Sequence, residues 1–83
     1  DMIRVLYFAS LRERLGSGEE VLQNFPPTLA GLRAQLAARG GAWSEVFADE
    51  RRVLAAVNQE MASAGQALQT GDEVGFFPPV TGG

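Results

Sequence analysis

Two apolar, β-forming segments lie at opposite ends of this 83-residue chain, and they restrict its fold more than any other feature. Residues 3–8 are apolar at every position except Arg4, which is typical of a strand that is covered on both faces. Residues 73–77 are almost as apolar and predict the last strand. We therefore expect both segments to be central strands of one sheet. Neighbouring central strands from opposite ends of a chain can run parallel.

A second strand is expected soon after the first. Residues 9–15 predict a short helical turn that ends at Gly16, because glycine readily adopts the left-handed conformation that closes a helix. Residues 20–25 predict a strand that stops at Pro26, since proline lacks the amide hydrogen that a sheet needs. The first two strands would then form a hairpin with an elaborated loop.

The middle of the chain predicts helices. Thr28 is a candidate N-cap, and Leu29, Leu32 and Leu36 recur at the spacing of one helix face. A second short helix is expected over residues 42–48. Three of its side chains should turn toward the core: Trp43, Val46 and Phe47.

The remaining segments complete the predicted fold. Residues 52–57 predict a third strand, 58–59 a turn, 60–62 a brief further pairing and 68–72 a second turn. The order hairpin, helix, strand, short strand, strand indicates an α+β fold of the β-grasp, or ubiquitin-like roll, type. It is a mixed sheet with one main helix packed on one face. We expect a single domain over residues 1–83 with a flexible carboxyl-terminal tail at 78–83.

Composition excludes several classes of function. The sequence has no Cys and no His, which removes thiol nucleophiles, imidazole acid–base chemistry, disulfides and the usual zinc ligands. The formal net charge is −3 and no basic cluster is present, so we expect no nucleic-acid partner. No apolar stretch reaches the length of a membrane span, and the amino-terminal apolar run is too short for a signal peptide. We therefore expect no membrane partner and a cytoplasmic location.

The sequence ends in two glycines, Gly82 and Gly83. A segment without side chains can enter a narrow active site where any Cβ would clash. Pro78 and Pro79 favour an extended course before it, and six extended residues reach about 20 Å. This ending predicts a protein whose own terminal carboxylate is the substrate. A frayed terminus is the alternative, which the apolar residues 76–80 disfavour.

Three stretches carry a resemblance to a known family. They are residues 3–9 with 11–13, residues 54–59 (LAAVNQ) and residues 71–83 (GDEVGFFPPVTGG). On these stretches the chain closely resembles the small subunit of molybdopterin synthase, a ubiquitin-like sulfur carrier, over essentially its whole length. The chain departs mildly from the family pattern at two positions. Relatives usually carry a better helix former at the position of Gly31, and Phe is common at the position of Tyr7.

The resemblance implies a carrier without catalytic side chains or a bound cofactor. An E1-like activating enzyme adenylates the Gly83 carboxylate with ATP and Mg²⁺, and a sulfur donor system converts the adenylate to a thiocarboxylate. The slim Gly82 keeps the approach to that group free of bulk. The tail then enters the large synthase subunit and donates sulfur to cyclic pyranopterin monophosphate, which builds the molybdopterin dithiolene. The implied assembly is a heterotetramer.

The resemblance also implies a docking surface for the large subunit, which includes Phe8, Met61 and Phe77. Ordinary core packing is the alternative for each. Alternation along the last strand places Phe77 on the face opposite Val74, which favours the interface for Phe77. The interface is also favoured for Met61, and Phe8 is left open between the two. The tail completes the expected partner-binding set: Pro78, Pro79, Val80 and Thr81.

Three other functions remain open from the sequence. A sulfur carrier for thiamin synthesis or tRNA thiolation would share the mechanism, although thiamin carriers lack the Phe-Phe-Pro-Pro-Val-Thr approach. A ubiquitin-like modifier conjugated to lysines would also need a glycine end. A plain interaction module would carry an inert tail.

Overall fold

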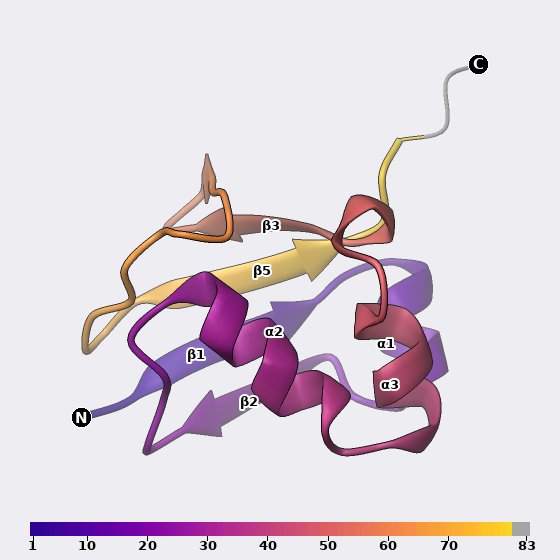
Figure 1. The fold of residues 1–83 in the computed structure, drawn as a ribbon, viewed down its shortest axis with the longest axis horizontal. Coiled ribbons are helices and arrows are strands. Elements are labelled where there is room, and N and C mark those ends of the chain that lie inside the picture. Colours follow the sequence, from indigo (N-terminus) through magenta and orange to yellow (C-terminus); the bar gives the residue numbers. More distant parts are fainter. Residues whose placement is uncertain (81–83) are drawn as a thin grey trace.

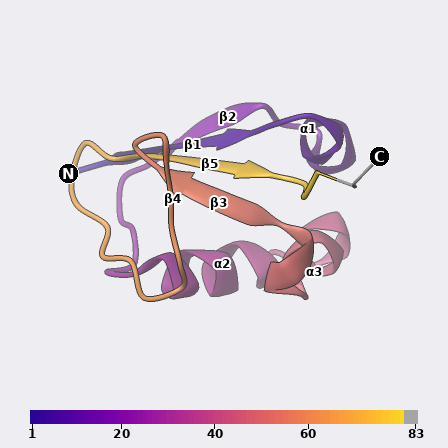
Figure 2. The same cartoon turned by 90° about the horizontal axis from the view of Figure 1, so that it is seen from above.

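The computed structural model describes residues 1–80 and confirms the expected β-grasp. Five strands form one mixed sheet, and two helices cover one of its faces (Figures 1 and 2). In chain order the elements are β1 (Ile3–Tyr7), α1 (Ser10–Leu15), β2 (Glu19–Leu22), α2 (Leu29–Ala37), α3 (Gly41–Phe47), the 3-10 helix η1 (Glu50–Arg52), β3 (Leu54–Val57), β4 (Glu60–Met61) and β5 (Glu73–Phe77). The strands lie side by side in the order β2-β1-β5-β3-β4.

The two terminal strands pair as expected. β1 and β5 are adjacent and parallel, with Val5 beside Val74 and Tyr7 beside Phe76. β5 also pairs antiparallel with β3, so it lies at the centre of the sheet. The prediction of neighbouring parallel strands from the two ends of the chain is confirmed.

One detail of that prediction is wrong, because β1 is covered on one face only. Ile3, Val5 and Tyr7 are buried, whereas Arg4 is exposed and Leu6 is half-buried. Side chains alternate along a strand, and the helices α2 and α3 both lie on one side of the sheet (Figure 2). The buried set belongs to the core, so it faces these helices. The apolar character of residues 3–8 therefore reflects a core on one face and a second apolar surface on the other.

Helix α2 begins and packs as its sequence predicts. Oγ1 of Thr28 accepts a hydrogen bond from the Gly31 amide at 3.2 Å, which caps the helix. The three leucines of the predicted stripe have no exposed surface: Leu29, Leu32 and Leu36. Burial of each leucine side chain stabilises the fold by roughly 1.5–3 kcal/mol.

Gly31 has a packing reason to be in this helix. A Cβ at Gly31 would lie 2.8 Å from Cβ of Pro26, closer than two such carbons approach. The helix therefore gives up about 1 kcal/mol of intrinsic propensity relative to alanine. Because Gly31 has no side chain, the segment before α2 can pass close to the first turn of the helix.

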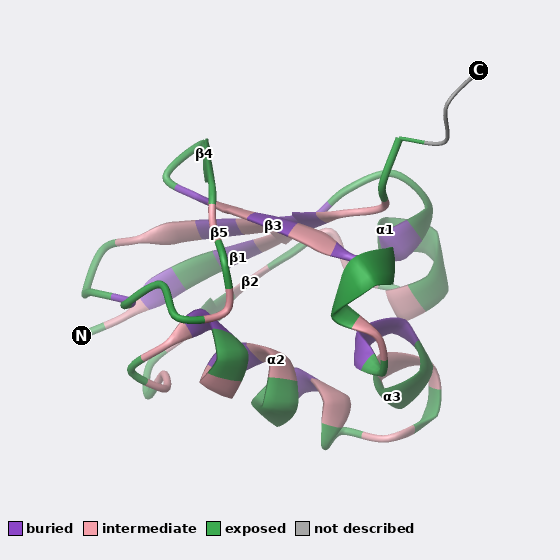
Figure 3. Cartoon of the chain, turned by 45° about the horizontal axis from the view of Figure 1, so that its top comes forward, coloured by how far each residue is buried: buried purple, intermediate pink, exposed green. Residues whose placement is uncertain are grey.

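Helix α3 completes the core as predicted. Val46 and Phe47 are buried, and Trp43 is partly buried against the core. The helix carries buried and exposed positions along its length (Figure 3). Aromatic rings connect the helix to the sheet, with centroids of Tyr7 and Trp43 5.3 Å apart and those of Phe47 and Phe76 5.0 Å apart. Both pairs are edge-to-face, a favourable arrangement for two rings.

Two strands, β2 and β3, are two residues shorter than predicted. β2 ends at Leu22, three residues before the predicted end, and a loop leads from there to Pro26. The third strand begins at Leu54 instead of residue 52, because η1 uses the preceding residues. The Asp49 carboxylate accepts a hydrogen bond from the Arg51 amide at 3.0 Å and caps that short helix.

A polar cluster joins β1, β2 and the segment after α2. The buried Tyr7 hydroxyl donates to Oε2 of Glu20 at 2.7 Å, and Arg39 donates to both Glu20 oxygens at 2.8 Å. The hydrogen bonds from Arg39 lower the pKa of Glu20, and they outweigh the opposite effect of its burial. Burial, together with the hydrogen bond to Glu20, raises the pKa of Tyr7 above its usual range. The cluster therefore holds one charged carboxylate in a defined position.

Glu20→Gln should make the free energy of unfolding less dependent on pH in the acid range. The folded-state pKa of Glu20 is depressed, so its charged contacts stabilise the fold above the unfolded pKa and are lost as pH falls through the folded pKa. We expect the variant to lose about 1–2 kcal/mol of unfolding free energy at neutral pH. Its stability should then decline less steeply than that of the wild type below the ordinary pKa of 4.5. Urea unfolding across this pH range measures both effects, and identical pH slopes would contradict the assignment.

Candidate docking face and tail

The face of the sheet opposite the helices is apolar at its centre. Gly75 on β5 lies beside Leu6 on β1 and Ala56 on β3, and Phe77 lies beside Leu54. Directly paired residues point to the same side of a sheet, and the intervening residues of β5 are buried on the other side. We call this surface the docking face; it comprises Leu6, Phe8, Leu54, Ala56, Met61, Gly75 and Phe77.

The predicted docking residues all lie on this face. Phe8 is 47% exposed, Met61 is 64% exposed and Phe77 is half-buried. Such exposure excludes ordinary core packing for Phe8, which the sequence left open. Contiguous exposed apolar side chains indicate an interaction surface. The placement is observed, whereas binding of a large subunit to this face stays a prediction.

Gly75 allows the Phe8 ring to lie against the sheet. A Cβ at Gly75 would be 2.9 Å from Cε2 of Phe8. The Phe8 amide donates to the carbonyl of Phe76 at 3.0 Å, which fixes the backbone at the end of β1. The ring therefore covers the middle of β5, and its outer surface contributes to the docking face.

Sequence reasoning missed part of this face. Leu6, Leu54 and Ala56 are half-buried and belong to it by their pairing with β5. Alternation along the first strand is a signal that groups Leu6 with Phe8. No comparable signal gives the register between β3 and β5, which brings Leu54 beside Phe77.

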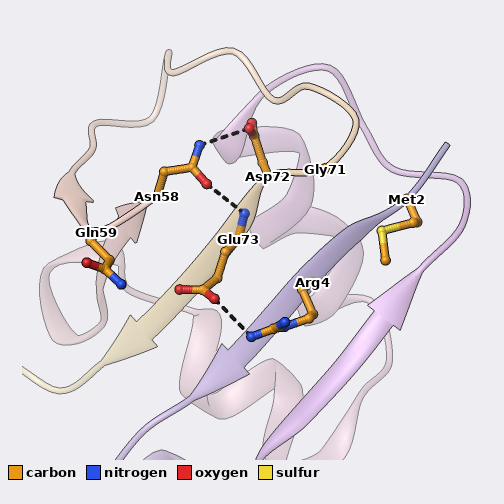
Figure 4. A pocket seen from close by; sticks show the side chains of 7 residues that line it. All are labelled: Met2, Arg4, Asn58, Gln59, Gly71, Asp72 and Glu73. Atoms are coloured by element: carbon orange, nitrogen blue, oxygen red, sulfur yellow. Dashed lines mark hydrogen bonds and ion pairs between the residues drawn. The ribbon is translucent and has the colours of Figure 1, made fainter.

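The opposite end of the face carries charge. Arg4 pairs with Glu19 at 3.2 Å and with Glu73 at 3.0 Å. Asn58 donates to Asp72 at 2.9 Å and accepts from the Glu73 amide at 3.0 Å (Figure 4). Arg4, Asn58, Asp72 and Glu73 line a polar cleft of about 490 Å³. These groups satisfy one another's charges and hydrogen bonds. We therefore interpret them as structural residues that stabilise the turn before β5.

The tail leaves from the apolar end of β5 (Figures 1 and 2). Pro78 is half-buried, Pro79 is exposed and Val80 is 91% exposed. These residues form neither helix nor strand. Three predicted site residues lie outside the described part of the chain: Thr81, Gly82 and Gly83. The docking face and the start of the tail adjoin, since Phe77 belongs to one and Pro78 to the other.

The described residues contain neither a metal-binding cluster nor a membrane-spanning helix. Residues 1–80 contain no group of three or more Asp, Glu, His or Cys side chains that is placed to hold a metal ion. The helices in this part of the chain are all too short or too polar to cross a membrane. Absence of a cofactor from the chain stays a prediction.

Phe77→Ala and its neighbour Phe76→Ala should differ sharply in stability. Phe76 has no exposed surface, so its truncation leaves a cavity and should cost about 3–5 kcal/mol of unfolding free energy. Phe77 points to the docking face, and its truncation should cost about 1 kcal/mol or less. Thermal unfolding of both variants measures the difference. Equal losses would place Phe77 in the core and refute the assignment.

Gly75→Ala should displace the Phe8 ring without unfolding the domain. The added Cβ meets the outer end of an exposed side chain, which can rotate away. We expect a change in stability within about 1 kcal/mol and the loss of nuclear Overhauser contacts between the Phe8 ring and β5. The control is the double variant Phe8→Ala, Gly75→Ala, which has room for the Cβ. Contacts that survive in the single variant would contradict the close approach.

Comparisons with known proteins agree with this geometry. The chain is 48% identical over 83 residues to the molybdopterin synthase sulfur carrier subunit of Escherichia coli (strain K12), which covers 99% of this chain and 100% of the relative. A Pyrococcus furiosus structure described as putative molybdopterin converting factor, subunit 1 superimposes with a TM-score of 0.78 at 30% identity, over 95% of this chain and 98% of that chain. Small archaeal modifier protein 1 of H. volcanii superimposes with a TM-score of 0.77 at 29% identity, with the same coverage.

The match to a family covers nearly the whole chain. Residues 5–83 match the ThiS family, and this range includes the whole docking face and the tail. Relatives of equal length and the ubiquitin-like architecture agree with the match. The chain therefore belongs to the ThiS family of ubiquitin-like sulfur carriers.

Proposed function

We propose that this chain is the sulfur-carrier subunit of molybdopterin synthase and acts in molybdenum cofactor biosynthesis. The observation that carries the proposal is the 48% identity, over both full lengths, to the Escherichia coli subunit of that name. The fold supports it, because a docking face and the start of an extended tail adjoin at one end of the central strand.

The proposed partner at the docking face is the large synthase subunit. Phe77 and Met61 offer an aromatic and a flexible apolar anchor, which are residue types that interfaces favour. Phe77 directly precedes the tail, so docking there fixes where the tail begins. A partner that holds Phe77 therefore controls the distance from its own surface to the terminal carboxylate.

The proposed chemistry takes place at the Gly83 carboxylate, on partner enzymes. Its oxygen attacks the α-phosphate of ATP, which Mg²⁺ neutralises, and pyrophosphate leaves. A donor system supplies sulfur at the oxidation level of hydrosulfide, which attacks the acyl carbon, displaces AMP and loses its proton to give the thiocarboxylate. In the large subunit this sulfur is transferred to cyclic pyranopterin monophosphate, and water attacks the acyl carbon and restores the carboxylate. A second carrier supplies the second sulfur of the dithiolene. Gly82 keeps the last step of the approach narrow.

Two features support a cytoplasmic site of action. Adenylation needs ATP, and a thiocarboxylate survives best where thiols stay reduced. An E1-like activating enzyme is the expected second partner. The carrier must leave it before it enters the large subunit, so the two partners bind in turn and not together.

A ubiquitin-like modifier is the second candidate, which the likeness to the H. volcanii modifier favours. Both functions begin with activation of the terminal glycine, and they differ in the acceptor. The intact mass of protein from its own cells detects sulfur in place of one oxygen at Gly83. A deletion strain that lacks molybdopterin supports the carrier, and a normal molybdopterin level with loss of protein conjugates supports the modifier.

Deletion of Gly83 should abolish molybdopterin formation and leave the domain folded. The reactive group would be withdrawn by one residue, roughly 3.3–3.6 Å. A displacement of about 1 Å can already lower a rate on the order of a hundredfold. The assay combines the carrier with large subunit, activating enzyme, ATP, a sulfur source and the pyranopterin precursor.

Gly82→Ala is the matched control for this deletion. It keeps the chain length and adds one methyl group, so it should slow entry of the tail more than the chemical step. Thermal unfolding should be unchanged in both variants. Wild-type rates from protein without Gly83 would overturn the proposed function.

A further inference from the structure

A second cleft lies at the root of the tail, apart from the docking face. It has a volume of about 420 Å³ and forms where α1, α3 and the end of η1 meet Pro78. Arg14, Glu45 and Arg52 are its charged lining residues. The cleft therefore combines an excess of positive charge with a position directly beside the tail.

The two arginines are available for a new partner. Arg52 is exposed and forms no ion pair among residues 1–80, and Asp49 on the same loop is bound by Arg51 at 3.2 Å. Arg14 approaches Glu45 at 3.7 Å, with half of the arginine side chain and 75% of the glutamate side chain exposed. An exposed pair at that distance is weak. Within residues 1–80 the cleft thus has one arginine that forms no ion pair and one that is loosely held.

The position of the cleft decides what happens to these charges in a complex. Pro78 lines the cleft and also begins the tail, so any protein that encloses the tail from its root must cover the rim of the cleft. Covering removes water from the guanidinium groups. A buried charge without a partner is strongly destabilising, so the covering protein must supply a compensating group.

We infer that the cleft formed by Arg14, Glu45 and Arg52 receives an acidic side chain of the subunit that encloses the tail. The inference rests on the proposed function and names the chemistry of that partner at the mouth of its channel: an aspartate or glutamate. Its carboxylate accepts hydrogen bonds from Arg52 and competes with Glu45 for Arg14. Arginine suits this role because its planar donor group matches a carboxylate. The apolar docking face supplies affinity, and this ion pair orients the carrier about the tail.

The test measures binding of the full chain to its large subunit by stopped-flow fluorescence at low and at high salt. Arg52→Glu should lower the association rate and weaken binding by about tenfold or more at low salt, since it places like charges together. Arg51→Glu is the matched control, because it makes the same change of charge one residue away and outside this cleft. It should weaken binding by about threefold or less, through long-range charge alone.

Glu45→Gln should act in the opposite direction. It removes the one carboxylate among the described residues that line the cleft, frees Arg14 and should tighten binding by about two- to fivefold. Thermal unfolding of each variant checks that the exposed substitutions leave the fold intact. The expected set of results is weaker binding for Arg52→Glu, tighter binding for Glu45→Gln and little change for Arg51→Glu.

Two outcomes would overturn the inference, and both leave the proposed function standing. One is equal weakening by Arg51→Glu and Arg52→Glu, which would show a general charge effect. The other is unchanged binding in Arg52→Glu while Phe77→Ala weakens it. If the wild-type chain itself does not bind the large subunit, the proposed function fails and this inference fails with it.

Discussion

The parallel pairing of β1 with β5 is the contact on which the rest of the structure depends. It joins strands from the two ends of the chain and places β5 at the centre of the sheet. Neither the core nor the docking face is complete without β5, because each takes alternate residues from it. The tail follows directly from this central strand. Folding of the domain therefore also fixes the position from which the tail begins.

Alternation along β5 gives one short strand two tasks. Val74 and Phe76 are fully buried, whereas Gly75 and Phe77 face away from the helices. Because the sheet has only one helical layer, the second set is free to form a surface. Gly75 then admits the Phe8 ring, so a residue beyond the end of β1 extends the apolar surface across the middle of the sheet. Core and docking face share a backbone, and substitutions at neighbouring positions should have separable effects.

The sequence predicted the elements well because local signals define them. The Thr28 cap, the leucine stripe after it and the glycine stop of α1 are local features, and the structure contains all three. Features that depend on contacts between distant segments were not predictable in this way. One is the register that brings Leu54 beside Phe77. Another is the backbone of Ala9, whose φ of 54° is uncommon for any residue other than glycine and is imposed by the turn after β1.

The cleft beside the start of the tail could not be predicted from the sequence either, because it also depends on contacts between distant segments. Arg14 and Arg52 are 38 positions apart in the sequence and show no common pattern there. They line one cleft only because α1 and the end of η1 both lie where β5 ends. Single charged residues in a sequence are ordinarily surface residues, so their meaning depends on such convergence.

The choice of cation links this cleft to the chemistry of the tail. An acyl adenylate at Gly83 would react with an amine or a thiolate, and the sequence contains neither lysine nor cysteine. Its seven cationic residues are all arginines, whose guanidinium groups stay protonated and are poor nucleophiles. Tyr7, the one phenol, is buried, and its pKa is raised. Positive charge beside the tail can therefore orient a partner without placing a nucleophilic side chain next to the activated terminus. The acyl group then remains available to the nucleophile that a partner delivers.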